Sequence, residues 1–110
     1  MANNKLISYL GFCIRSGKIV FGVDAIEQYK KRVHLLFADG SIGPNSMKIL
    51  IKAKENFSCE LLMTTAGALG EWLHRPAVKA VAILDKNLAQ AILSVIDGEP
   101  QVKSYSGGNN

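Results

Sequence analysis

The sequence predicts a single α/β domain, a three-layer α/β/α sandwich with a central mixed four-stranded sheet. Its 110 residues are the size of one domain. Hydrophobic residues make up 48% of the chain and charged residues 20%, a balance typical of a folded globular protein. Helical and strand patterns alternate along the chain, which favours a mixed sheet with helices on both faces.

The first third of the chain predicts a helix, a short strand and a second helix. Apolar residues recur at helical spacing before the stop signal Ser16-Gly17, so a helix is expected over 4–16. The apolar run 18–21 predicts a brief strand. Gly22 then opens a second helix, which buries Ile26, Tyr29 and Val33 and ends at the basic residues 30–32.

The middle of the chain continues the alternation. The apolar run 34–38, closed by Asp39-Gly40, predicts a strand buried on both faces. Pro44 suits the first turn of a third helix, which reaches Phe57. Residues 59–63 predict a further strand, and Thr65 is expected to cap a short helix that carries Trp72 in the core.

The last elements are a strand, a helix and a tail. The run 78–84 has the strongest strand pattern in the chain, and Asp85 is expected to cap a helix that ends before Gly98. We therefore predict one domain over residues 1–97 and a flexible C-terminal tail over 98–110.

Several classes of protein are disfavoured by composition. The two cysteines, Cys13 and Cys59, lack CxxC spacing and neighbouring histidines, so neither a disulfide framework nor a zinc site is indicated. No signal-peptide pattern and no apolar run of membrane-spanning length is present. No phosphate loop or GxGxxG motif occurs, so nucleotide binding has no support. We expect a cytoplasmic protein without a membrane segment and without a cofactor.

Candidate catalytic residues are few. His34 and His74 have no sequence-local partner arranged for nucleophilic catalysis, so we expect no catalytic residues and no metal site. Asp39 and Asp85 each follow a predicted strand, where open α/β sheets place ligand groups. The alternative is structural, with Asp39 opening a turn and Asp85 capping a helix, and we favour it.

Excess positive charge lies in the first third of the chain. The chain holds 13 Lys and Arg against 9 Asp and Glu, a net charge of +4. Residues 1–35 hold 6 of the basic and 2 of the acidic groups, so the remaining 7 of each sign cancel. This distribution favours a polyanionic partner for the N-terminal part, although ordinary solubilising charge is an alternative.

The segment 15–24 combines a basic helix end, a short strand and a glycine that opens a helix. A helix start offers free backbone N–H groups, and Gly22 lets a phosphate or sugar approach them. Lys18 and Lys31 would add positive charge around such an anion site.

The order of these motifs resembles a known family. Ser-Gly-Lys at 16–18, Gly22 before a helix, an apolar strand ending in Ala-Asp, Leu69-Gly70 and the strand 78–83 follow one another over residues 5–97. This order is similar to that of the kink-turn-binding ribosomal proteins of the L-seven-Ae / L-thirty-e type, with the bacterial YlxQ-like branch nearest. The resemblance implies a three-layer fold that binds kinked RNA through the glycine-led helix start and the loop before the last strand.

The resemblance also assigns site residues. In archaeal and eukaryotic members the glycine is followed by Thr-Asn-Glu, whose Asn and Glu read sheared G·A pairs. Here Val23, Asp24 and Ala25 follow Gly22, and Gln28 stands where those members offer a lysine. The predicted RNA-binding residues are Lys18, Gly22, Val23, Asp24, Gln28, Lys31, Arg75, Pro76, Ala77 and Val78.

The leading hypothesis is a non-enzymatic, monomeric RNA-binding protein, a ribonucleoprotein component that binds structured RNA such as ribosomal RNA. Its implied partners are that RNA and the ribosome. Two alternatives stay open, because Asp24 and Ala25 depart from the family's Asn and Glu. One is a protein-interaction adaptor on the same fold, and the other is an accessory domain of an RNA-modifying enzyme.

Overall fold

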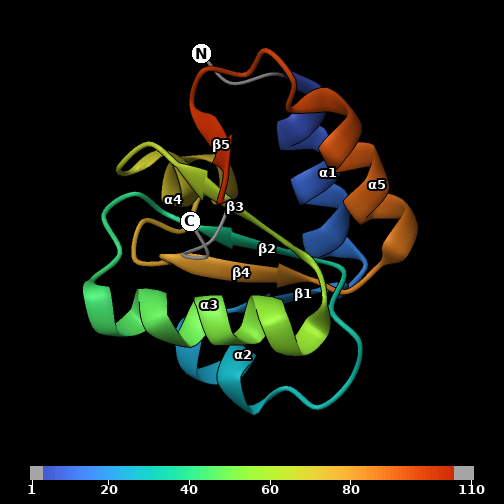
Figure 1. The fold of residues 1–110 in the computed structure, drawn as a ribbon. Coiled ribbons are helices and arrows are strands. Elements are labelled where there is room, and N and C mark those ends of the chain that lie inside the picture. Colours follow the sequence, from blue (N-terminus) through green and yellow to red (C-terminus); the bar gives the residue numbers. More distant parts are fainter. Residues whose placement is uncertain (1–3, 106–110) are drawn as a thin grey trace.

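A mixed five-stranded sheet lies between two layers of helices in the computed structural model, which describes residues 4–105 (Figure 1). The strand order is β1-β4-β2-β3-β5. The strands are β1 (Ile19–Phe21), β2 (Leu35–Ala38), β3 (Glu60–Thr64), β4 (Ala80–Ile83) and β5 (Val102–Ser104). Strands β2 and β3 are parallel, and the other neighbouring strands are antiparallel. The predicted three-layer fold is confirmed, with five strands in place of four.

Each face of the sheet has its own hydrophobic core. The helices α1 (Asn4–Arg15), α4 (Ala68–Leu73) and α5 (Lys86–Val95) cover one face, and α2 (Val23–Gln28) and α3 (Pro44–Phe57) cover the other (Figure 1). Alternate residues of β2 serve the two cores, since Leu35 and Phe37 belong to the first and Leu36 and Ala38 to the second. All four residues of β2 are therefore buried, as a strand covered on both sides requires.

The second helix is shorter than the sequence predicts. It has six residues and ends at Gln28, while Tyr29 is already extended, with φ −72° and ψ 131°. Val33 still reaches the core beside Ile26, but from an irregular segment leading into β2. The prediction of a helix reaching residues 30–32 is therefore wrong. Apolar residues at helical spacing can be buried on a helix or on a loop, and the spacing alone does not distinguish the two.

The predicted tail contains the fifth strand. Strand β5 pairs antiparallel with β3, with Leu62 opposite Ser104 and Thr64 opposite Val102. The N–H of Tyr105 also donates to the carbonyl of Leu61 over 2.7 Å. A flexible tail starting at residue 98 is therefore wrong for residues 98–105, because pairing satisfies the edge of β3. Residues 106–110 of that prediction lie outside the described residues.

Candidate nucleic-acid interface

Gly22 follows β1 and opens α2 at one end of the sheet. Its N–H donates to the carbonyl of Ala80 over 2.9 Å, which ties the turn to the start of β4. Its φ of 94° and ψ of 150° lie in a region that only glycine adopts readily. A Cβ built at Gly22 would meet no atom within 4 Å, so the backbone there is open to a ligand. Val23 beside it is half-buried and Asp24 is exposed.

The loop between α4 and β4 is fixed against its own helix. The N–H of Arg75 donates to the carbonyl of Gly70 over 2.9 Å, and the N–H of Val78 donates to the carbonyl of Arg75 over 3.0 Å. Gly70 has no room for a side chain, since a Cβ there would lie 2.9 Å from the Arg75 carbonyl oxygen. The exposed residues Pro76 and Ala77 are thereby presented on a defined turn.

The two segments meet through Arg75. Its guanidinium carbon lies 4.5 Å from the centre of the Phe21 ring, a cation–π contact between the loop and the last residue of β1. The structure thus brings together two segments that are about 50 residues apart in the sequence, Gly22–Asp24 and Arg75–Val78. We call these seven residues the turn–loop surface.

Three predicted residues lie away from the turn–loop surface. The carbonyl of Lys18 accepts from Leu84, at the opposite end of β4 from Ala80, where Gly22 is bound. Lys31 precedes β2, and the N–H of His34, just before that strand, donates to the carbonyl of Ile83 at that same far end. Gln28 is the last residue of α2 and is exposed. The backbones of Lys18 and Lys31 thus lie toward the far end of the sheet, and the charge that their side chains add around the Gly22 turn stays a prediction.

Helix α2 itself contributes little electrostatic attraction. It has only six residues, so few peptide dipoles add up at its start. Its N-cap is Gly22, without a side-chain capping bond, so Asp24 does not cap the helix. Asp24 lies instead in the first turn, where a carboxylate repels phosphate.

The two candidate carboxylates have structural roles. Strands β2 and β4 are antiparallel, so Asp39 and Asp85 follow them at opposite ends of the sheet and form no pair. Asp85 caps α5 by accepting from the N–H of Leu88 over 2.8 Å, as predicted. Asp39 takes over the role predicted for Thr65, because it accepts from the N–H groups of Gly67 and Leu69 at the start of α4.

Asp39 is a fully buried carboxylate with many donors. Besides Gly67 and Leu69, it accepts from the N–H and hydroxyl of Ser41 and from the hydroxyl of Thr64. Burial by itself raises the pKa of this carboxyl, but the bonds from Gly67, Ser41 and Leu69 outweigh it and lower the pKa to about 2. The carboxylate of Asp39, just after β2, is thereby hydrogen-bonded to β3 through Thr64 and to the start of α4 through Leu69.

The remaining reactive side chains are protected. Burial is the largest cause that raises the pKa of both Cys13 and Cys59 to about 11, so the thiols are protonated at neutral pH.

Trp72 is in the core, as predicted. Among residues 4–105, no three His, Cys, Asp or Glu side chains are grouped in a way that could hold a metal ion. No helix of that same range is long and apolar enough to cross a membrane.

Sequence reasoning missed two residues that build the turn–loop surface. From the sequence, Phe21 is only an apolar strand residue and Gly70 only part of a motif. In the structure, the Phe21 ring contacts Arg75, and the missing side chain of Gly70 lets the backbone of the loop pack against α4. A glycine inside a helical pattern is a signal for such a close approach.

The fold and the surface define a small three-layer α/β/α protein whose candidate binding surface joins a strand-to-helix turn to a neighbouring loop. A comparison with protein-family models and a comparison with curated proteins both return no match. Among solved structures, a protein of unknown function from Bacillus halodurans C is similar, with a TM-score of 0.70 and 18% identity. The match covers 86% of this chain and 99% of that chain, and it shows the fold.

Proposed function

We propose that this chain binds structured RNA through the turn–loop surface, without catalysing a reaction, as an RNA-binding protein of the kink-turn-binding type. The observation that carries the proposal is the contact between Arg75 and Phe21, which joins the two segments that the sequence resemblance assigns to RNA. Both segments lie on one end of the sheet, where a single ligand can reach them.

The chemistry of the turn–loop surface suits a nucleic acid. The open backbone at Gly22 admits a sugar or phosphate edge that a side chain would keep away. Arg75 is exposed and positively charged, and a guanidinium donates to phosphate oxygens or to a guanine edge. Since the net charge of the chain is only +4, we expect a modest number of phosphate contacts and a shallow salt dependence.

The proposal is tested by reversing the charge of Arg75. The Arg75→Glu variant is compared with Lys103→Glu, an equal charge change on the exposed strand β5. Affinity is measured for an RNA hairpin with an asymmetric internal loop containing G·A pairs, at two salt concentrations. We expect Arg75→Glu to weaken binding about tenfold or more, since a charge-assisted contact is lost and a repulsion is gained, and Lys103→Glu to change it little.

Thermal unfolding of both variants serves as the control for folding. Equal weakening by both variants would show that only net charge matters, and the turn–loop surface would be discarded. Absence of RNA binding by the wild type at about 100 mM salt, beside a stable complex with a protein, would favour the adaptor.

A further inference from the structure

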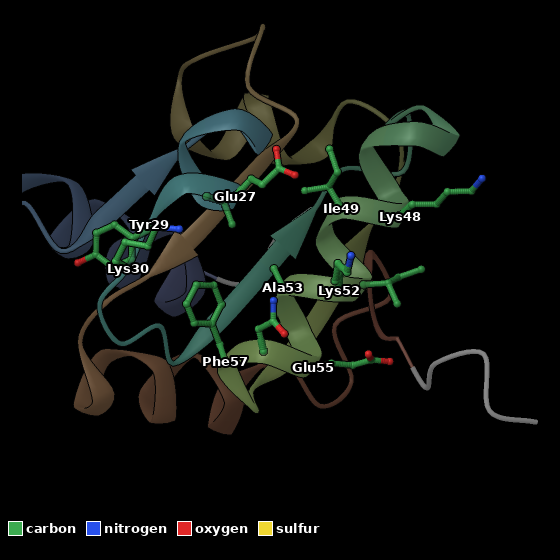
Figure 2. A pocket seen from close by; sticks show the side chains of 12 residues that line it. Glu27, Tyr29, Lys30, Lys48, Ile49, Lys52, Ala53, Glu55 and Phe57 are labelled. Atoms are coloured by element: carbon green, nitrogen blue, oxygen red, sulfur yellow. The ribbon is translucent and has the colours of Figure 1, made fainter.

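A hollow of about 630 Å³ lies between α2 and α3, on the helical layer that these two helices form (Figure 2). Its walls come from Ile26 to Lys30 on one side and from Lys48 to Phe57 on the other. A second hollow, of about 500 Å³, lies over the loop 30–32. The two hollows share Lys30, Asn56 and Phe57 and therefore adjoin, and together we call them the α2–α3 groove.

Two aromatic rings line the α2–α3 groove at the C-terminal ends of the helices. Tyr29, just after α2, and Phe57, the last residue of α3, are both half-buried and rest on the core beneath (Figure 2). Packing below holds the rings in place, while their partial exposure leaves surface for a ligand. The amide of Asn56, exposed beside them, offers both a donor and an acceptor.

The rim of the groove is predominantly basic. Five cationic side chains line it, against the two carboxylates Glu27 and Glu55. The cations are Lys30, Lys31, Arg32, Lys48 and Lys52. Lys31 and Arg32 extend the positive charge past the aromatic end, whereas Lys48 points away from the hollow (Figure 2). An anionic ligand that also carries flat apolar groups complements this lining.

We propose that the α2–α3 groove binds unpaired nucleotides of RNA, with a base against Tyr29 and Phe57 and phosphates at the basic loop 30–32. Aromatic faces beside a basic track are the usual means of holding single-stranded nucleic acid, because every base has a π face. The volume lies within the range of small-ligand sites, enough for a nucleotide. An acidic peptide would pair with the cations but would leave the two aromatic rings and the amide of Asn56 without a ligand group to contact.

The location of the groove agrees with an RNA that also occupies the turn–loop surface, and the inference rests on that proposed function. Gly22 opens α2, and Tyr29 follows its last residue. A six-residue helix is about 9 Å long, so a strand leaving the folded part of an RNA reaches the groove within a few nucleotides. Lys31, which lines the groove, thereby gains a place beside the RNA.

The experiment varies the RNA and the protein together. The probe is the hairpin with an asymmetric internal loop, either blunt or extended at each end in turn by five adenosines or by five abasic riboses. The abasic extension keeps the phosphates and removes the bases. Each RNA is titrated with the wild type, Tyr29→Leu, Tyr29→Phe and the matched control Tyr9→Leu, a half-buried tyrosine of α1 on the opposite core.

We expect one adenosine extension to bind the wild type at least about fivefold more tightly than the abasic extension, the gain from stacking one base. Tyr29→Phe and Tyr9→Leu keep this gain, and Tyr29→Leu loses it. In case Tyr29→Leu unfolds, chemical-shift changes of Tyr29, Asn56 and Phe57 in the wild type on adding the extension provide a second measurement. Equal affinity for adenosine and abasic extensions at both ends would overturn the inference.

Failure of the proposed function gives a different result. If the blunt hairpin does not bind, a free ten-nucleotide oligoadenosine decides the matter alone, since Tyr29-dependent binding supports the groove and no binding overturns it. Displacement of the adenosine extension by a glutamate-rich peptide of equal charge, at equal affinity, would also overturn it, because charge alone would then explain the groove.

Discussion

The guanidinium carbon of Arg75 lies 4.5 Å from the centre of the Phe21 ring and links the loop before β4 to the end of β1. A similar contact, between Arg15 and Phe12 at 4.9 Å, joins residues of the same helix and holds no loop. We expect a double-mutant cycle with Arg75→Ala and Phe21→Leu to give a coupling of about 0.5–1 kcal/mol in stability. Phe21→Leu should also weaken RNA binding, whereas Phe12→Leu should not. Additive effects at Arg75 and Phe21 would contradict this.

The close approach at Gly70 gives a test of the loop that alters no exposed side chain. A Cβ there would lie 2.9 Å from the Arg75 carbonyl oxygen and 3.0 Å from the Cα of Pro76, so Gly70→Ala must displace the loop backbone. We expect a loss of about 1–3 kcal/mol of stability and weaker RNA binding. Gly11→Ala is the control, because a Cβ at Gly11 meets only the flexible end of Arg15. Full RNA affinity in Gly70→Ala would show that the loop position is unimportant.

The residues after Gly22 predict weak discrimination between RNA structures. The family that the sequence resembles reads G·A pairs with an amide donor and a carboxylate acceptor. Asp24 lacks that amide donor, and Ala25 lacks that carboxylate. Each lost bidentate contact costs about 1–3 kcal/mol of discrimination. A kink-turn should therefore bind less than tenfold better than a plain stem-loop, and the double change Asp24→Asn and Ala25→Glu should raise this ratio. A strong wild-type preference in competition titrations would show that other residues read the RNA.

Asp39 makes stability depend on pH at the acid end. Its pKa is about 2 in the folded protein, below the ordinary value of 3.8, so its contribution is complete above pH 4 and is lost as the pH falls to 2. The shift corresponds to roughly 2 kcal/mol. Urea unfolding of Asp39→Asn should show lower stability at pH 7 and a flatter decline between pH 4 and 2. Asp97→Asn, at an exposed turn, should keep the wild-type profile.

Strand β5 predicts which C-terminal truncations are tolerated. A chain ending at Asp97 removes the partner of β3 and the bond from Tyr105 to Leu61, so we expect it to lose about 1–3 kcal/mol of stability. A chain ending at Tyr105 keeps both and should unfold like the full chain. Amide exchange of Thr65, whose N–H donates to the carbonyl of Gln101 over 2.9 Å, and of Met63, opposite Lys103, measures the pairing directly. Equal exchange in the two truncated chains would contradict the role of β5.

Local sequence patterns already indicate the α/β alternation, the buried strands β2 and β4, the cap at Asp85 and the glycine that opens α2. These features depend on local patterns of apolar spacing and on residues whose backbone preferences are strong. Contacts between segments far apart in the sequence follow from the strand pairing and not from local patterns. The antiparallel pairing of β1 and β4 places Gly22 beside the Arg75 loop and leaves Lys18 at the far end, and it separates Asp39 from Asp85. Strand β5 was hidden for the same reason, because Val102–Ser104 is a strand only where the open edge of β3 supplies its hydrogen bonds.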